Sequence, residues 1–148
     1  MAETQGPLFT DADIDRQARG NAAALPYLMV AFAKACGRSP AEAAAFAGRA
    51  FAPGWEELRG QVVLAVARTM ALNLASCGAG VRAVAGGDDR AEVRVAGYPT
   101  AEDAAFFGVT PADVDAFFDV FGLIGAHLGL RCEWQRAGEE VVVTVSRY

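Results

Sequence analysis

Few residues of this chain belong to the types that most often carry enzyme chemistry. It has one histidine and three cysteines among 148 residues, and no cysteine belongs to a CxxC pair or a Cys/His cluster. Zinc sites are built from such clusters, so the sequence predicts no metal site. The glycines form neither GxGxxG nor GxxxxGK[ST], the two patterns that cradle phosphates. We therefore expect no nucleotide and no other cofactor.

Clustered positive charge is also missing. Thirteen basic and eighteen acidic residues give a net charge of -5, and the basic residues are scattered. A nucleic-acid footprint needs grouped cations, so this partner class is excluded. The apolar run Val62 to Ala75 contains Arg68 and is shorter than the roughly 20 residues that span a bilayer. Because residues 1–9 carry Glu3 and lack the apolar run of a signal peptide, we expect a cytoplasmic protein without a membrane partner.

What the chain does have is enough apolar material for one core. Its hydrophobic residues make up 53% of a length typical of a single globular domain. The pattern predicts one domain over residues 1–148, with a flexible lead-in at 1–9, a helical half at 10–78 and a hairpin-helix-hairpin half at 79–148.

Capping signals predict the helices of the first half. Thr10 and Ser39 are each followed three positions later by a carboxylate, which is the pattern of a helix start. The first helix should run to Cys36, with Pro26 breaking or kinking it. A third helix, from Trp55 to Ser76, is apolar nearly all round in its second half and should be the central buried helix.

Alternation of apolar and polar residues predicts two hairpins in the second half. They pair residues 81–84 with 92–96, and residues 130–135 with 141–145. Thr100 and Thr110 should begin two helices between the hairpins, the second running to about Leu128. An isolated hairpin is marginal, so we expect an α+β fold with one four-stranded antiparallel sheet and helices packed on one of its faces.

Three residues are candidates for catalysis. His127 is the only side chain whose ordinary pKa lies between pH 5 and 8, and it ends a helix, so it either caps that helix or acts as acid or base. Glu102 follows a strand-to-helix turn, where a side chain can contact a ligand or act as a second acid or base. Cys77 is a candidate nucleophile without a partner in the sequence, whereas Cys132 should be an inert core thiol.

Aromatic residues are concentrated in the second half and are interpreted as core or as pocket walls. Tyr98, Trp134, Trp55 and Phe106 are the candidates for ligand contact. The adjacent pairs Phe106-Phe107 and Phe117-Phe118 cannot both face the core from one helix. One member of each pair should therefore meet a ligand pocket or a dimer surface.

The segment from Glu92 reads Glu-Val-Arg-Val-Ala-Gly-Tyr-Pro-Thr-Ala-Glu-Asp-Ala-Ala-Phe-Phe-Gly-Val. Its strand, proline turn and acidic-aromatic helix, with the closing hairpin, resemble the L-2-amino-thiazoline-4-carboxylic acid hydrolase-like family and the related 4-vinyl reductase small-molecule-binding domains. The resemblance covers about the last third of the chain and implies a sheet that encloses a ligand cavity. A cysteine commonly precedes the proline in that family. Tyr98 stands there, and residues 141–147 have no cysteine either, so the resemblance implies no thiol-dependent role.

These observations predict a small-molecule-binding domain with an aromatic-lined cavity between the sheet and the helices. It would either bind its ligand alone or hydrolyse a small cyclic or amide-like compound. The alternative is a non-catalytic sensor or interaction domain that forms a homodimer through exposed aromatic helix faces.

Overall fold

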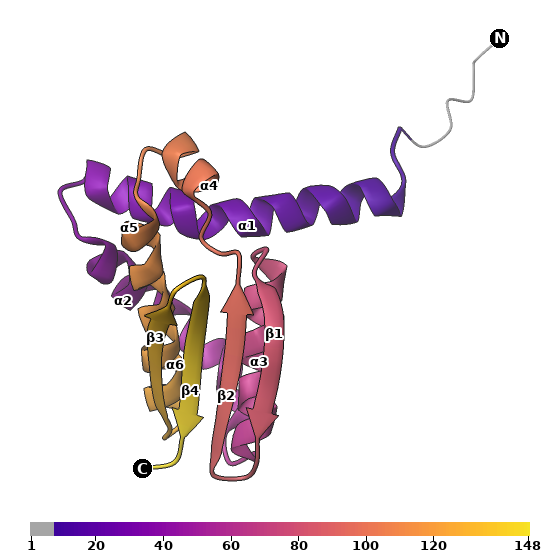
Figure 1. Ribbon diagram of the computed structural model, residues 1–148, viewed down its shortest axis with the longest axis vertical. Coiled ribbons are helices and arrows are strands. Elements are labelled where there is room, and N and C mark those ends of the chain that lie inside the picture. The colour runs from indigo at the N-terminus through magenta and orange to yellow at the C-terminus, as the bar shows by residue number, and fades with distance from the viewer. Residues whose placement is uncertain (1–7) are drawn as a thin grey trace.

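The computed structural model describes residues 8–148, so most of the expected lead-in at 1–9 lies outside the described residues. The elements follow one another as helices, a hairpin, helices and a second hairpin (Figure 1). They are α1 (Asp11–Ala35), α2 (Pro40–Phe51), the 3-10 helix η1 (Ala52–Leu58), α3 (Val63–Ser76), β1 (Gly80–Gly86), β2 (Arg90–Ala96), α4 (Ala101–Phe106), α5 (Pro111–Asp115), the 3-10 helix η2 (Ala116–Asp119), α6 (Val120–His127), β3 (Arg131–Ala137) and β4 (Glu140–Ser146).

The two hairpins join into one antiparallel sheet of order β1-β2-β4-β3, which confirms the α+β prediction. Val93 pairs with Val143 and Val95 with Val141 in the centre of the sheet. Alternate residues of these strands are fully buried, and helices α3 and α6 lie behind this face (Figure 1). Helices therefore cover one face of the sheet, as the alternation required.

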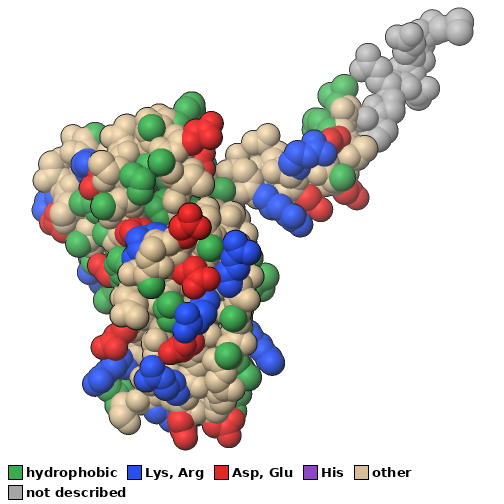
Figure 2. Space-filling view, viewed as in Figure 1, with side chains coloured by type: hydrophobic (Ala, Val, Ile, Leu, Met, Phe, Trp, Pro, Cys, Tyr) green, Lys and Arg blue, Asp and Glu red, His purple; other side chains and the backbone are tan. Residues whose placement is uncertain are grey.

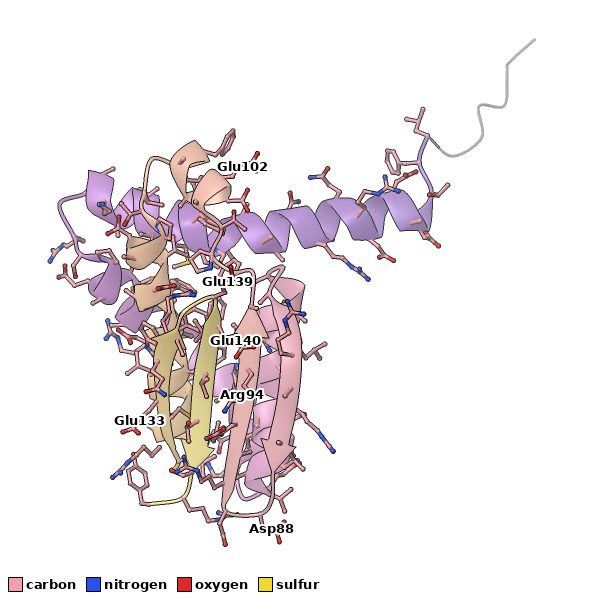
Figure 3. The ribbon with its side chains drawn as sticks, viewed as in Figure 1. Asp88, Arg94, Glu102, Glu133, Glu139 and Glu140 are labelled. Atoms are coloured by element: carbon pink, nitrogen blue, oxygen red, sulfur yellow. The ribbon has the colours of Figure 1, made fainter. Side chains whose placement is uncertain are left out.

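The other face of the sheet is polar. Arg94 lies 3.4 Å from Glu92 on the same strand and 3.9 Å from Glu140 on the neighbouring strand β4. Figure 3 shows Arg94, Glu133 and Glu140 on the face turned away from the helices. Positive and negative side chains are interspersed over this surface (Figure 2), so the uncovered face carries mixed charge and is exposed to water. Among residues 8–148, no helix combines the length and the apolarity needed to cross a membrane.

The predicted helix starts are confirmed by their hydrogen bonds. Thr10, Ser39 and Thr110 each form a reciprocal capping box with a carboxylate three residues later. The Thr100 side chain accepts from the backbone N–H of Asp103. These caps satisfy backbone donors that have no partner within the helix.

Two predictions about helix interiors are wrong. α1 runs without a break through Pro26, because Tyr27 and Val30 pack into the core on the same side and this packing outweighs the roughly 3 kcal/mol cost of an internal proline. The helix predicted from Trp55 begins only at Val63. Residues 52–58 form a 3-10 helix instead, and Gly60 follows it with a φ of +77° that no helix accommodates.

The helix predicted from Thr110 to about Leu128 is also divided. Its first turn is α5, its middle is the 3-10 helix η2, and α6 completes it. η2 places Phe117 and Phe118 beside each other at the upper end of the sheet. This irregular stretch forms one wall of the cavity described next.

Candidate functional site

A cavity of about 380 Å³ lies among the helices beside the end of β2. Its walls come from α1, the α2–η1 junction, the C-terminal end of α3, and the α5–η2–α6 segment. Two residues just outside the regular elements, Cys77 and Tyr98, complete it. The sequence predicted a cavity between the sheet and the helices. In residues 8–148 the lining comes mainly from helices, and Tyr98, just after β2, is the lining residue on the side of the sheet.

The walls of the cavity are apolar and carry no charge. Trp55, Phe117, Phe118 and Phe121 supply aromatic surface, and the remaining residues are mostly aliphatic. Burying an unpaired charge in such surroundings is costly, so the cavity suits an uncharged ligand. Leu25 and Phe51, which are about half exposed, mark the side that opens to solvent, and Asn73 and Ser76 lie there as polar rim residues.

Tyr98, one of the lining residues, carries an exceptional polar group in its buried hydroxyl. Its side chain is only 7% exposed, and within the described residues its oxygen is the sole buried side-chain polar atom without a hydrogen-bond partner. Burial raises the pKa of Tyr98, and the nearby Cys77 and Tyr27 raise it further, so the hydroxyl keeps its proton. A protonated hydroxyl can donate one hydrogen bond and accept another. Orphaned buried polar groups are rare and call for a functional explanation.

Tyr27 holds Tyr98 in place, a role that no sequence pattern indicated. The Tyr27 ring meets the Tyr98 ring edge to face, with centroids 5.5 Å apart. Its hydroxyl accepts a hydrogen bond of 2.8 Å from the backbone N–H of Thr100. The contact joins α1 to the segment after β2 across 73 positions of sequence, a separation at which periodicity and spacing carry no information.

Cys77 lies in the cavity, but its surroundings do not activate it. Burial raises the pKa of its thiol, partly offset by a hydrogen bond with Ser76. A catalytic cysteine needs the opposite shift, from a base, a cation or a helix N-terminus. Cys132 fits the prediction of an inert thiol, since burial raises its pKa to about 12.

His127 lies outside the cavity lining and bridges two elements. Its Nε2 lies 2.6 Å from Glu56 of η1, and Arg59 bonds the same carboxylate at 2.6 and 3.0 Å. Arg59 also donates to the His127 carbonyl at the end of α6. This cluster ties the 3-10 helix to the C-terminal end of α6. The His127 imidazole bonds Glu56, and Arg59 rather than His127 bonds a carbonyl at the helix end.

The Glu56 carboxylate makes stability pH-dependent in a definite direction. Hydrogen bonding to Arg59, and then to His127, lowers the pKa of Glu56 from 4.5 to about 2. Because the folded protein favours the ionised carboxylate, Glu56 stabilises the fold at pH values above 4.5, its pKa in the unfolded chain. This stabilisation is lost as the pH falls from 4.5 to about 2. The urea midpoints of the wild type and Glu56→Gln should therefore differ at pH 6 and converge by pH 2. A difference that is constant over this range would contradict the assignment.

The other predicted site residues lie outside the cavity. Glu102 is exposed on α4, and Figure 3 shows it pointing away from the sheet. Phe106 is 83% exposed, whereas its neighbour Phe107 stacks on Tyr27 with centroids 5.7 Å apart. Trp134 packs on Phe118 at 5.4 Å and donates its indole N–H to Asp119 at 2.7 Å. Of the seven candidates, the structure brings together Tyr98, Trp55 and Cys77.

No group of three or more His, Cys, Asp or Glu side chains gathers as metal ligands in the part of the chain that the structure describes. The chain matches no protein-family model, no curated protein and no solved structure. These comparisons lend no support to the family resemblance of residues 92–147.

Proposed function

We propose that this protein binds an uncharged, mainly apolar small molecule that carries one hydrogen-bonding group, in the cavity closed by Tyr98. The observation that supports this most directly is the unpartnered Tyr98 hydroxyl in an apolar lining. Leaving such a group unsatisfied costs about 1–3 kcal/mol, which a ligand oxygen or N–H would recover on binding. The hydroxyl would fix the orientation of the ligand, and the aromatic walls would supply contact area.

The size of the cavity limits the ligand. A volume of about 380 Å³ lies at the small end of the range for ligand pockets, roughly 300–1,000 Å³. One or two fused or linked rings fit this volume, as does a short branched chain. A carboxylate ligand would bury its negative charge in the cavity without a cation to pair with. We therefore propose neutral cyclic compounds, amides, ketones and phenols as the ligand classes.

Binding without turnover is the form of this function that the cavity favours. Hydrolysis of an amide-like compound needs an activated nucleophile or a general base within hydrogen-bond reach of the substrate. The Cys77 thiol has a raised pKa, and Glu102 and His127 are not among the lining residues. The Tyr98 hydroxyl can polarise a carbonyl, but a second group would have to deliver the water.

A single substitution separates a binding role for Tyr98 from a structural one. Tyr98→Phe removes the unpartnered hydroxyl and keeps the ring, so the free protein should be equally stable or more stable by about 1 kcal/mol. Ligand affinity should fall roughly tenfold, because one buried hydrogen bond is lost. Stability is measured by urea unfolding, and affinity by calorimetry.

The ligands for this experiment come from a thermal-shift screen of neutral ring ketones, phenols and amides, each paired with the same skeleton lacking its polar atom and with its carboxylate. We expect the neutral polar member of a pair to raise Tm most. Tyr148→Phe removes the same hydroxyl from an exposed ring that does not line the cavity; it is the matched control and should leave affinity unchanged. A Tyr98→Phe variant that loses stability but keeps affinity would contradict the proposal, as would a preference for carboxylates.

A further inference from the structure

Helix α1 carries an apolar stripe on the side that faces solvent. Its members alternate in steps of four and three residues, the spacing of a coiled-coil seam. The residues that α1 buries against the rest of the protein, among them Tyr27 and Val30, lie on its other side. The stripe therefore lies apart from the buried side of α1. It consists of the apolar Ile14, Ala18, Leu25, Leu28 and Phe32 and the polar Asn21, and Leu25 also borders the mouth of the ligand cavity.

This stripe is exposed in the single chain. Leu28 is 54% exposed and Phe32 is 69% exposed. The N-terminal half of α1 projects away from the body (Figure 1), and of residues 11–21 only Asp13 is partly covered. Helical segments shorter than about 12–15 residues are marginal in water without tertiary contacts. Within residues 8–148, the projecting half of α1 thus lacks the packing that normally maintains a helix.

An apolar groove lies beside the opposite end of the same stripe. It runs between α1 and α2, measures about 500 Å³, and has Phe32 and Phe46 as its largest walls. Phe46 is 66% exposed, so nothing in the described chain fills the groove. Arg38 and Arg49 lie along it with Glu42, which gives its rim a net positive charge.

We propose that two copies of this chain pair antiparallel through their α1 stripes, so that the projecting end of each α1 occupies the α1–α2 groove of the other. One register satisfies the whole stripe: Ile14 lies opposite Phe32, Ala18 opposite Leu28, and Asn21 opposite Leu25. Each contact then combines a smaller with a larger side chain, as interdigitated helix packing requires. The pairing is two-fold symmetric and self-complementary, which is the commonest form of oligomer.

Charge selects the antiparallel direction. The projecting end carries Asp11, Asp13 and Asp15 with Arg16 and Arg19, so it is net negative, and the groove that it enters is bordered by Arg38, Arg49 and Glu42 and is net positive. A parallel pair would instead place the three aspartates of one helix beside the same three of the other. The antiparallel pair also offsets the two helix dipoles. The projection of α1 leaves room for the partner's body at the end where its own body is absent (Figure 1).

The first test is the mass of the full chain in solution, by sedimentation equilibrium over a range of concentrations. The wild type should be a dimer. Leu28→Asp should raise the dimer dissociation constant at least about 100-fold, because symmetry removes two buried leucines and inserts two charges. Leu72→Asp is the matched control: Leu72 is 69% exposed on α3 but lies outside the stripe and the groove, and its variant should remain dimeric.

Circular dichroism checks that both variants keep their fold, which is expected since both positions are exposed. A wild type that is monomeric through the micromolar range would overturn the proposal. So would a Leu28→Asp variant that stays as dimeric as the Leu72→Asp control.

The second test fixes the direction of pairing with the native Cys36, which is exposed at the end of α1. In Asp11→Cys, a short bis-maleimide should link position 11 of one chain to Cys36 of the other and double the mass on a denaturing gel. Within one chain these positions lie at opposite ends of a 25-residue helix, about 37 Å apart, and cannot be linked. Gln17→Cys is the control and should link poorly to Cys36. Links between two copies of Cys36 in the wild type would indicate a parallel pair and overturn the register.

Discussion

Replacing Gly86 by alanine should destabilise the fold by about 3 kcal/mol or more. Gly86 ends β1 with a φ of +142°, a conformation that residues with a Cβ rarely adopt. A Cβ at this position would lie 2.3 Å from the Arg90 carbonyl oxygen and 2.4 Å from the Ala91 Cα. Both are backbone atoms of the paired strand, so neither can move without opening the hairpin.

The damage should extend beyond the hairpin, because the same turn caps α3. The N–H of Leu64 donates to the Gly87 carbonyl at 3.0 Å, and the N–H of Val63 donates to the Asp88 carbonyl at 3.1 Å. α3 has no side-chain cap of its own. Its first N–H groups therefore depend on the position of this turn. α3 buries one face, with Val63 and Met70, and is not buried all round as the sequence predicted, since Leu72 is 69% exposed.

The matched control is the adjacent glycine. Gly87→Ala meets no atom within 4 Å, and its φ lies outside the left-handed region. It should change the free energy of unfolding by no more than about 0.5 kcal/mol. Urea unfolding followed by circular dichroism measures both variants. Equal effects of the two substitutions would show that the close approach at Gly86 does not constrain the fold.

The parts of the fold that could be predicted from the sequence are those set by neighbouring residues. Capping pairs such as Thr10 with Asp13 act over three positions, and apolar alternation in residues 141–145 acts over two. These signals gave the helix starts, both hairpins and the joining of the hairpins into one sheet. They failed at residues 55–62, where a continuous helical pattern is broken by Gly60 and the helix start is supplied by the distant β1–β2 turn.

Only part of the candidate site could be predicted from the sequence, for the same reason. Tyr98 and Trp55 could be named as aromatic residues near turns, but their meeting with Cys77 depends on the packing of α1, α3 and α6. The missing partner of the Tyr98 hydroxyl has no sequence signature, since it depends on how Tyr27 and Phe118 pack around the Tyr98 ring. His127 was singled out for its rarity. Its contact with Glu56, 71 positions away, could not be read from spacing.

Asp115→Ala should cost about 2 kcal/mol, because it leaves the Arg136 guanidinium partly buried without its partner. Arg136 bonds both oxygens of Asp115 at 2.6 Å, and only 14% of the Asp115 side chain is exposed. The same guanidinium donates to the Tyr98 carbonyl at 3.2 Å and to the Gly138 carbonyl at 3.3 Å. The pair thus ties β3 and α5 to the residue that carries the unpartnered hydroxyl of the cavity.

Arg94, on the open face of the sheet, provides a control for the Asp115–Arg136 pair. Arg94→Ala removes an exposed cation that lies 3.4 Å from Glu92 on the open face, and such a surface pair is worth no more than about 1 kcal/mol. Raising the salt concentration should reduce the loss of stability caused by Arg94→Ala and leave the loss caused by Asp115→Ala nearly unchanged.

Replacing both partners, in Asp115→Leu with Arg136→Met, should recover much of the lost stability, because no unpaired charge remains. Ligand affinity should fall in Asp115→Ala, where Arg136 is no longer held, and should stay low in the double variant, where the Tyr98 carbonyl has lost its donor. Urea unfolding and calorimetry on the same three variants separate the two effects. A double variant that regains stability and affinity together would mean that Arg136 contributes to folding alone.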